Sequence, residues 1–180
     1  MASILNDNLF TTLVHYANPQ EVGCRMLTSL GPICAKFNER GLNALYFDDD
    51  PDHKGWVDSV FREAFLKWLS AFQQMAPATQ WSYLAPDGTD YQKSVWRQLL
   101  ELPIGDKMSY AQLAQTMGAP KSARAVGSAV AANPICLLIP CHRIVNASGT
   151  SGNYRWGADR KLALLDLERR EGCDLLSLFQ

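Results

Sequence analysis

The sequence lacks the features that direct a chain into a membrane or out of the cell. Its apolar stretches stay far below the roughly 18 residues that a membrane-spanning helix needs. Residues 1–12 lack the basic start and hydrophobic core of a secretory signal. The five cysteines form no CxxC pair and there are only three histidines, which argues against a disulfide framework or a cysteine-rich zinc site. We therefore expect a cytoplasmic protein with reduced thiols, no metal and no cofactor.

The sequence also lacks an excess of acidic or basic residues, since the 180 residues carry a formal net charge of −1. The distribution is uneven: residues 1–88 hold 10 acidic and 6 basic residues, whereas residues 89–180 hold 8 acidic and 11 basic residues. The mildly basic second half is compatible with a polyanionic partner, although an asymmetry of this size also arises by chance. An apolar content of 47% suffices for a folded core.

The first half has the pattern of a mixed α/β domain. Apolar runs at 33–37 and 42–47 flank the polar segment Asn38-Glu39-Arg40-Gly41, which predicts a β-hairpin. Over 56–74 the apolar residues recur with the 3.6-residue period of an amphipathic helix. They are Val57, Val60, Phe61, Ala64, Phe65, Trp68, Leu69 and Phe72.

Two further segments of this half are predicted to be irregular. The acidic run 48–52 is interpreted as a solvated loop without a function. Segment 77–90 is rich in turn residues and coincides with the change in charge balance. We place a domain boundary there, between domains 1–86 and 87–180.

The second half is predicted to be mostly helical. A helix over 90–102 ends at Pro103 and Gly105, with Tyr91, Val95, Leu99 and Leu102 on one face. Ser109 begins a short helix that runs through Met117, Gly118 ends it, and a second helix follows over 121–132. Two short helices joined by a tight turn resemble a helix-turn-helix, although helical hairpins are also common in proteins that bind no DNA.

The second helix of this pair is built of small residues around one long cation, Arg124. Small residues allow a backbone to approach a narrow DNA minor groove, into which an arginine can insert. Close packing between helices would favour the same small residues, so both interpretations stand at this point.

Cys141 is the candidate nucleophile. The apolar run 137–139 predicts a strand that ends at Pro140, immediately before Cys141, His142 and Arg143. Nearby His and Arg side chains are expected to lower the pKa of a thiol and to favour the reactive thiolate. Adjacent residues point apart on helices and strands, so His142 must meet Cys141 at a turn or through a water. The alternative is an inert buried cysteine.

These residues together resemble a known family, the methylated-DNA–protein-cysteine methyltransferases, or O6-alkylguanine-DNA alkyltransferases. The resemblance covers residues 89–172. Its motifs are Pro140-Cys141-His142-Arg143-Ile144-Val145, Asn133-Pro134, Ala123-Arg124-Ala125-Val126-Gly127, Ser109-Tyr110, Gly152-Asn153-Tyr154 and Lys161 to Glu168. The first half is similar more loosely, through Thr28-Ser29-Leu30-Gly31-Pro32 and the hairpin.

The resemblance implies an α+β fold, with a ribonuclease H-like N-terminal α/β domain and a mostly helical C-terminal domain that carries a winged helix-turn-helix-like element. It implies a monomer that binds double-stranded DNA through the minor groove and flips out O6-alkylguanine, and also O4-alkylthymine. The alkyl group would pass irreversibly to Cys141, once per molecule. Such a protein would be nucleoid-associated in a prokaryote and nuclear in a eukaryote.

The resemblance also implies residue roles. Cys141 would be the nucleophile, His142 a water-mediated base and Glu168 the residue that orients the imidazole. Asn133 would order the turn that carries the thiol, and Tyr110 would donate to the leaving guanine. The substrate pocket would include Ile144, Tyr154, Arg155 and Trp156. The DNA-binding residues would be Lys121, Ser122, Ala123, Arg124, Ala125 and Gly127, with Arg124 filling the vacated stack.

The sequence departs from the family pattern in one way that bears on substrates. Trp156 stands where some relatives have a small residue, so a narrower pocket is expected. Two alternatives remain: a helix-turn-helix protein that binds alkylated DNA without repairing it, and a cysteine hydrolase or redox enzyme. Cys141 argues against the first, because the nucleophile position is not cysteine in such binders. The second leaves Arg124 and its small-residue helix without a purpose.

Overall fold

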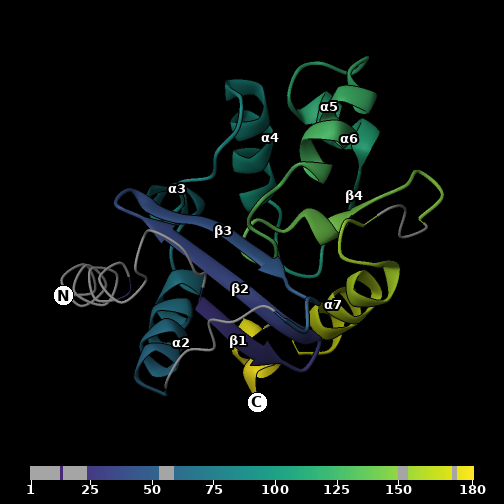
Figure 1. Cartoon of the computed structure of the whole chain (residues 1–180). Coiled ribbons are helices and arrows are strands. Elements are labelled where there is room, and N and C mark those ends of the chain that lie inside the picture. The colour runs from purple at the N-terminus through teal and green to yellow at the C-terminus, as the bar shows by residue number, and fades with distance from the viewer. Residues whose placement is uncertain (1–12, 14–23, 53–58, 150–153, 172–173) are drawn as a thin grey trace. The chain divides into compact units, whose positions relative to one another are not determined.

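The computed structural model describes residues 13, 24–52, 59–149, 154–171 and 174–180. The chain forms two compact units: the described residues up to Ala85 together with Leu175–Gln180, and the described residues of 86–174 (Figure 1). The fold is mixed α/β, with six α-helices and small sheets among the described residues. None of these helices combines the length and the apolarity needed to cross a membrane.

The first unit is built on an antiparallel sheet in the order β1-β2-β3. The strands are β1 (Cys24–Thr28), β2 (Gly31–Asn38) and β3 (Gly41–Phe47). The predicted hairpin is confirmed as β2 and β3, and its turn is closed by Asn38 Oδ1, which accepts from the backbone N–H of Gly41 at 3.1 Å. Gly41 is required because a Cβ there would lie 2.6 Å from the Tyr83 carbonyl oxygen. Strand β1 was not among the predicted elements.

Helix α2 (Ser59–Gln73) packs its aromatic face on this sheet. Phe37 of β2 meets Phe61 and Trp68 of α2 edge-on, with ring centroids 6.5 and 6.4 Å apart. The amphipathic helix is thereby confirmed over its described residues, whereas the predicted start at 56–58 lies outside them. Val60 was assigned to the buried face wrongly, because its side chain is 54% exposed.

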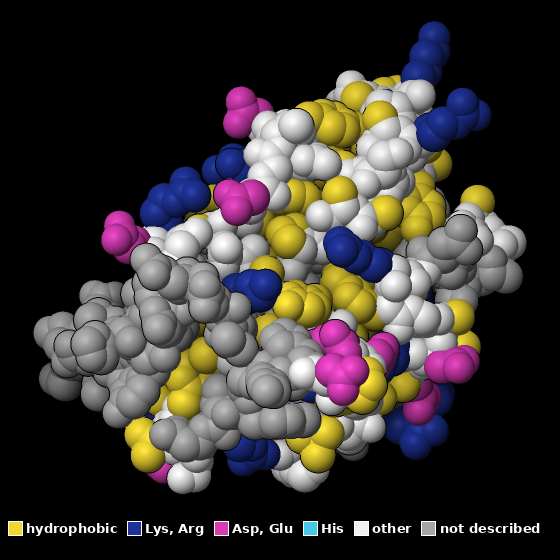
Figure 2. All heavy atoms as spheres, viewed as in Figure 1, with side chains coloured by type: hydrophobic (Ala, Val, Ile, Leu, Met, Phe, Trp, Pro, Cys, Tyr) yellow, Lys and Arg dark blue, Asp and Glu magenta, His cyan; other side chains and the backbone are white. Residues whose placement is uncertain are grey.

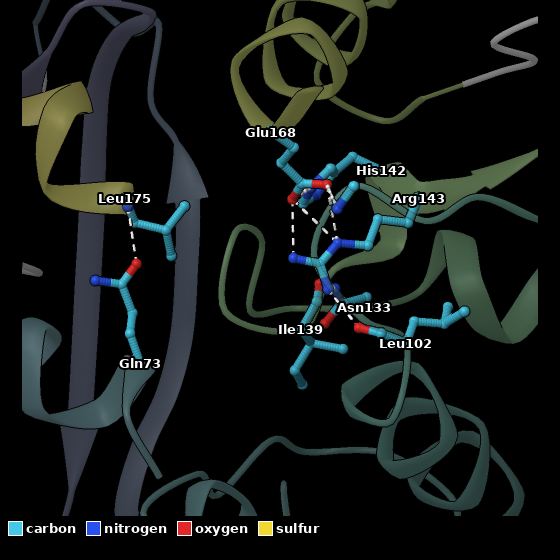
Figure 3. A network of polar contacts seen from close by, with 9 residues as sticks. Gln73, Leu102, Asn133, Ile139, His142, Arg143, Glu168 and Leu175 are labelled. Carbon is cyan, nitrogen blue, oxygen red and sulfur yellow. Dashed lines mark hydrogen bonds and ion pairs between the residues drawn. The ribbon is translucent and has the colours of Figure 1, made fainter. Parts of the chain in front are cut away.

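The last six residues return to the first unit, although the predicted C-terminal domain extended to residue 180. The 3₁₀ helix η2 (Leu175–Phe179) is held by backbone and side-chain bonds. The backbone N–H of Ser29 donates to the Leu178 carbonyl at 2.7 Å, and that of Leu175 donates to Gln73 Oε1 at 2.8 Å (Figure 3). Arg62 also donates to the Phe179 carbonyl.

Two irregular segments of the first unit differ in part from the prediction, although Asp49, Asp50 and Asp52 of the acidic run are exposed in a loop as predicted. Pro77–Ser82 forms the short helix α3. Pro77 lies in its first turn, where a backbone N–H has no partner within the helix, so a proline there costs no hydrogen bond. Asp48, at the start of the acidic run, is buried rather than solvated. Its carboxylate lies 3.4 Å from Arg25 Nε, and its carbonyl accepts from Arg25 Nη2 at 3.0 Å. The charge of Arg25 explains why Asp48 can be buried.

The second unit is mostly helical. It contains α4 (Asp90–Leu100), β4 (Met108–Ser109), α5 (Tyr110–Thr116), α6 (Ala123–Ala131), the 3₁₀ helix η1 (Cys141–Arg143), β5 (Ile144–Val145) and α7 (Ala158–Glu171). The predicted caps are confirmed, because Ser109 forms a capping box with Gln112 and Gly118 follows α5 with φ at +71°. Of the predicted face of α4, Val95 and Leu99 are buried, but Tyr91 is exposed.

The predicted strand before the thiol is absent. Residues 137–139 form tight turns, in which the N–H of Leu138 donates to the Cys136 carbonyl at 2.8 Å and Leu137 has φ at +68°. A short apolar run indicates burial but does not distinguish a strand from a buried turn. The described pairing near the thiol is instead the parallel bridge of β4 with β5, Met108 opposite Ile144.

Candidate active site

Cys141 begins the η1 turn and is 4% exposed. Its sulfur is held by Asn133, whose buried Nδ2 lies 3.1 Å from Cys141 Sγ. The same nitrogen lies 2.9 Å from the Ile139 carbonyl, and Asn133 Oδ1 accepts from the backbone N–H of Ile135 at 3.0 Å. One buried amide therefore connects the end of α6, the apolar turns and the thiol.

Burial changes the chemistry expected of this thiol. Desolvation raises the pKa of Cys141 to about 11, although the Asn133 bond and the positive charge of Lys161 act in the opposite direction. The expectation of a lowered thiol pKa is therefore wrong for the free protein. The sulfur carries its proton at neutral pH, and it becomes a nucleophile only when a base removes that proton.

A buried base lies in the same turn. His142 Nε2 is 2.7 Å from Glu168 Oε1, and both side chains are almost completely buried (Figure 3). Because an ionised carboxylate can only accept, Nε2 carries the hydrogen and Nδ1 is left with a lone pair. Nδ1 is buried and makes no hydrogen bond within the described residues. Burial lowers the pKa of His142, so the ring is neutral and able to accept a proton.

Glu168 is held from two further directions. Arg143 donates from Nε and Nη2 to the carboxylate at 2.9 to 3.0 Å, and the backbone N–H of Gly105 donates to Oε2 at 3.2 Å. Burial acts to raise the pKa of Glu168, but the hydrogen bonds from His142 and Arg143 outweigh it and lower the pKa to about 2. The carboxylate is therefore ionised throughout the physiological range.

Lys161 and two tyrosines complete the surroundings of the thiol. Lys161 is buried on α7, and its Nζ donates to the Ile144 carbonyl at 2.5 Å. The hydroxyl of Tyr154 is buried, and burial together with the nearby Cys141 raises the pKa of Tyr154, although no hydrogen bond of ordinary geometry joins the two. Burial and Cys141 likewise raise the pKa of Tyr110.

Helix α6 presents an exposed face of small residues with one arginine. Arg124, Ala125 and Ser128 are exposed, whereas a Cβ at Gly127 would lie 3.6 Å from the Tyr110 ring. In Figure 2 the charged side chains visible over α5 and α6, at the upper right, are Lys and Arg. The end of α6 is fixed by Trp96, whose Nε1 donates to the Ala129 carbonyl at 2.8 Å. The helix that leads to Asn133 is thus anchored from α4.

Comparison with known proteins identifies the family. The model of the 6-O-methylguanine DNA methyltransferase DNA binding domain matches residues 90–170. The methylated-DNA–protein-cysteine methyltransferase of Mycobacterium leprae is 36% identical over 165 residues, which cover 88% of this chain and 99% of that protein. The chain belongs to the methylated-DNA–protein-cysteine methyltransferase family. The Methanosarcina acetivorans family member is 40% identical over 147 residues, 77% of this chain and 92% of that protein.

Solved structures of the family have the same fold. The Mycobacterium tuberculosis OGT in complex with DNA matches with a TM-score of 0.68 and 33% identity, over 89% of this chain and 100% of that one. The O6-methylguanine-DNA methyltransferase of the archaeon Pyrococcus kodakaraensis matches with a TM-score of 0.58 and 26% identity, over 76% of this chain and 90% of that one. The mixed α/β fold expected for a methyltransferase of this family is thereby confirmed.

The structure of this family member brings most of the predicted site residues together. Asn133 with Cys141 and His142 with Glu168 form two buried pairs that meet at adjacent residues of η1, and burial together with Cys141 raises the pKa of Tyr110. Ile144 contacts the site through its carbonyl, which accepts from Lys161 Nζ. Lys121, Arg124 and Ala125 are exposed, whereas Ser122, Ala123 and Gly127 are partly buried. Gly152 and Asn153 of the family motif lie outside the described residues.

Tyr154, Arg155 and Trp156 form a small cluster just before α7. The rings of Tyr154 and Trp156 meet edge-on at 5.3 Å, and the Arg155 guanidinium lies 5.6 Å from the Trp156 ring centre. Trp156 therefore contacts both of the residues that precede it. Among the described residues, no three His, Cys, Asp or Glu side chains form a group that could hold a metal.

Sequence reasoning missed Arg143 and Lys161 as parts of the site. Lys161 was quoted only as the start of a motif, yet Lys161, Leu164 and Glu168 are spaced to lie on one face of a helix, and all three are buried. That spacing was a usable signal. Arg143 was regarded only as a neighbour of the thiol, because nothing in the sequence shows that its guanidinium binds Glu168.

Proposed function

We propose that this protein repairs DNA by transferring the alkyl group of O6-alkylguanine, and of O4-alkylthymine, to Cys141 in one irreversible step. One observation carries the proposal: in a member of this family, a buried thiol lies beside a neutral histidine that a buried carboxylate orients. The test is mass spectrometry after incubation with an O6-methylguanine duplex. A single methyl group that stays on Cys141 supports the proposal, and unmodified protein beside unrepaired DNA contradicts it.

The geometry supports a reaction in which every proton and electron pair has a donor and an acceptor. Through one water, His142 Nδ1 takes the proton of Cys141, and Glu168 stabilises the imidazolium that forms. The sulfur attacks the alkyl carbon, the bond from that carbon to O6 breaks, and its electron pair stays on the guanine. Tyr110 donates to the departing base, which leaves as neutral guanine once it has gained a proton. Cys141 becomes a thioether, which explains a single turnover.

Backbone groups would read the flipped base. The carbonyls of Cys141 and Ile144 are proposed to accept from the guanine amine, and the N–H of Arg155 to reach O6. The Ile144 carbonyl already accepts from Lys161 at 2.5 Å. A carbonyl oxygen has two lone pairs, so it can serve both donors. Lys161 would then fix the direction of one of the base-reading groups.

DNA binding is assigned to α5 and α6 as a winged helix-turn-helix-like element in contact with the minor groove. The exposed small face of α6 supports this, since it allows close approach to the sugar edges. The first unit is proposed to be a ribonuclease H-like support, and the protein to act as a monomer wherever the cell keeps its DNA. Because damage occurs in any sequence, binding is expected to depend on phosphate contacts and on salt.

Arg124→Ala is expected to slow methyl transfer by about 10- to 100-fold. A flipped base leaves a gap in the stack, and unstacking costs a few kcal/mol that an inserted side chain offsets. Rates of transfer from saturating duplex measure this step. Lys121→Ala is the matched control, because loss of an exposed cation at the same helix should weaken binding and lower its salt dependence without slowing the bound complex. Equal rates for Arg124→Ala and wild type would contradict the insertion.

O6-Benzylguanine is expected to react more slowly than O6-methylguanine. Trp156 packs edge-on against the Tyr154 ring and lies close to the Arg155 guanidinium, so we expect these contacts to keep it from swinging aside for a bulky group. Single-turnover rates for the two bases test this, and Trp156→Ala should raise the rate for the benzyl base more than that for the methyl base. Comparable wild-type rates for both bases would show that the pocket is not narrowed.

A further inference from the structure

Arg143 is a buried cation that binds one carboxylate and one backbone carbonyl. Its side chain is 10% exposed, and two of its nitrogens bind the Glu168 carboxylate. The third, Nη1, donates to the carbonyl of Leu102 at 2.6 Å, directly after α4 (Figure 3). The guanidinium is therefore fixed at one end by backbone and at the other by the carboxylate.

This arrangement gives Glu168 one orientation. Nε lies 3.0 Å from both carboxylate oxygens, while the Gly105 N–H binds Oε2 at 3.2 Å. Oε1 is thereby directed at His142 Nε2, 2.7 Å away. A carboxylate without these partners could rotate or take up a proton, and it would then no longer define which imidazole nitrogen carries hydrogen.

We infer that Arg143 is a positioning residue for alkyl transfer, which holds Glu168 ionised and oriented so that His142 keeps Nδ1 free to accept the thiol proton. The inference rests on the proposed function for its catalytic consequence, but its effect on the imidazole can be measured without DNA. Arg143 does not touch the thiol or the base that is repaired. It acts through Glu168 and then through His142.

The charge of Arg143 also sets the direction of a pH effect. Glu168 favours a proton on the His142 ring, whereas Arg143 and Lys161 disfavour it. Removing the Arg143 charge should therefore make the His142–Glu168 pair take up an additional proton at higher pH. The extra proton occupies Nδ1, so the acid side of the rate profile should move to higher pH and the rate should recover as the pH is raised.

The experiment compares Arg143→Met and Arg143→Lys with wild type in the full chain. Imidazole ¹⁵N signals report the tautomer and titration of His142, and the other two histidines, His15 and His53, serve as internal references. Single-turnover methyl transfer is measured across the same pH range. Arg170→Met is the matched control, because Arg170 binds Asp166 at 2.8 Å on the exposed side of α7. That variant should leave both readouts unchanged.

Arg143→Met is expected to raise the titration midpoint of His142, to shift the acid limb of the rate in the same direction, and to slow transfer at neutral pH by about 10- to 100-fold. Arg143→Lys keeps the charge but not the two-pronged geometry, so it should titrate nearly as wild type and lose a smaller part of the rate. If Arg143→Met does not fold, Arg143→Lys alone tests the inference.

The inference is overturned if the folded variants match the wild-type tautomer, titration and rate profile, whatever happens to their melting temperatures. Arg143→Lys at the wild-type rate across the pH range would equally overturn it. Failure of the proposed function has a different signature: wild type would show the Nε2–H tautomer, Arg143→Met would disturb it, and yet wild-type Cys141 would acquire no methyl group.

Discussion

Cys141→Ala is expected to abolish alkyl transfer completely and to leave DNA binding close to the wild-type level. The sulfur is the proposed acceptor of the alkyl group, and its replacement by a methyl side chain leaves no nucleophile at that position. The exposed face of α6 is untouched by the substitution. The folded state loses the contact from Asn133 Nδ2 to the sulfur, a bond worth about 1 kcal/mol. Methyl transfer and duplex binding are measured on the same preparation.

Cys136→Ala is the control for this variant. Cys136 is also a fully buried thiol, five positions earlier in the turns that precede the site. Its loss should leave a small cavity and a modest loss of stability, while the protein still becomes methylated. Methyl transfer to another residue in Cys141→Ala would show that Cys141 is not the sole acceptor, and inactivity of Cys136→Ala would show that loss of activity in these turns does not single out Cys141.

Local signals made part of the fold predictable. The β2–β3 turn and the capping boxes of α4 and α5 follow from residues three apart, whose side chains satisfy backbone groups of their own turn. The turns at 135–139 and the burial of Asp48 were not predictable in this way. The burial of Asp48 depends on Arg25, 23 residues away, and the turns are held by the Asn133 amide, which reaches as far as the Ile139 carbonyl six residues on.

The candidate site was likewise predictable only in part. Cys141 and His142 were singled out from their local sequence and Glu168 from the family resemblance, whereas the protonation of the thiol was predicted wrongly. Adjacent His and Arg side chains suggested a thiolate, but in the structure the Arg143 charge is directed at Glu168 and burial dominates the pKa of Cys141. Sequence adjacency does not tell whether two side chains face each other, nor how far water reaches them.

Glu168→Gln is expected to lower the free energy of unfolding by about 3–5 kcal/mol at neutral pH. The substitution leaves the Arg143 guanidinium buried without its counter-charge, which is the costly way to break a buried ion pair. Transfer should also slow, because an amide can donate to His142 Nε2 and thereby permit the wrong tautomer. Urea unfolding and single-turnover rates measure the two effects. Asp166→Asn, on the exposed part of α7, is the control and should change both only slightly.

The pH dependence of stability gives the same variant a second signature. Hydrogen bonds from His142 and Arg143 overcome the effect of burial and lower the pKa of Glu168 from 4.5 to about 2. A lowered carboxyl pKa contributes stability above the unfolded-state value, and this contribution is lost as the pH falls toward the folded-state value. Wild type should therefore lose about 3 kcal/mol between about pH 4.5 and pH 2 from this group. Glu168→Gln, with no carboxyl to protonate, should show a flatter acid limb, so parallel limbs for the two proteins would mean that Glu168 is not the ionised centre of the network.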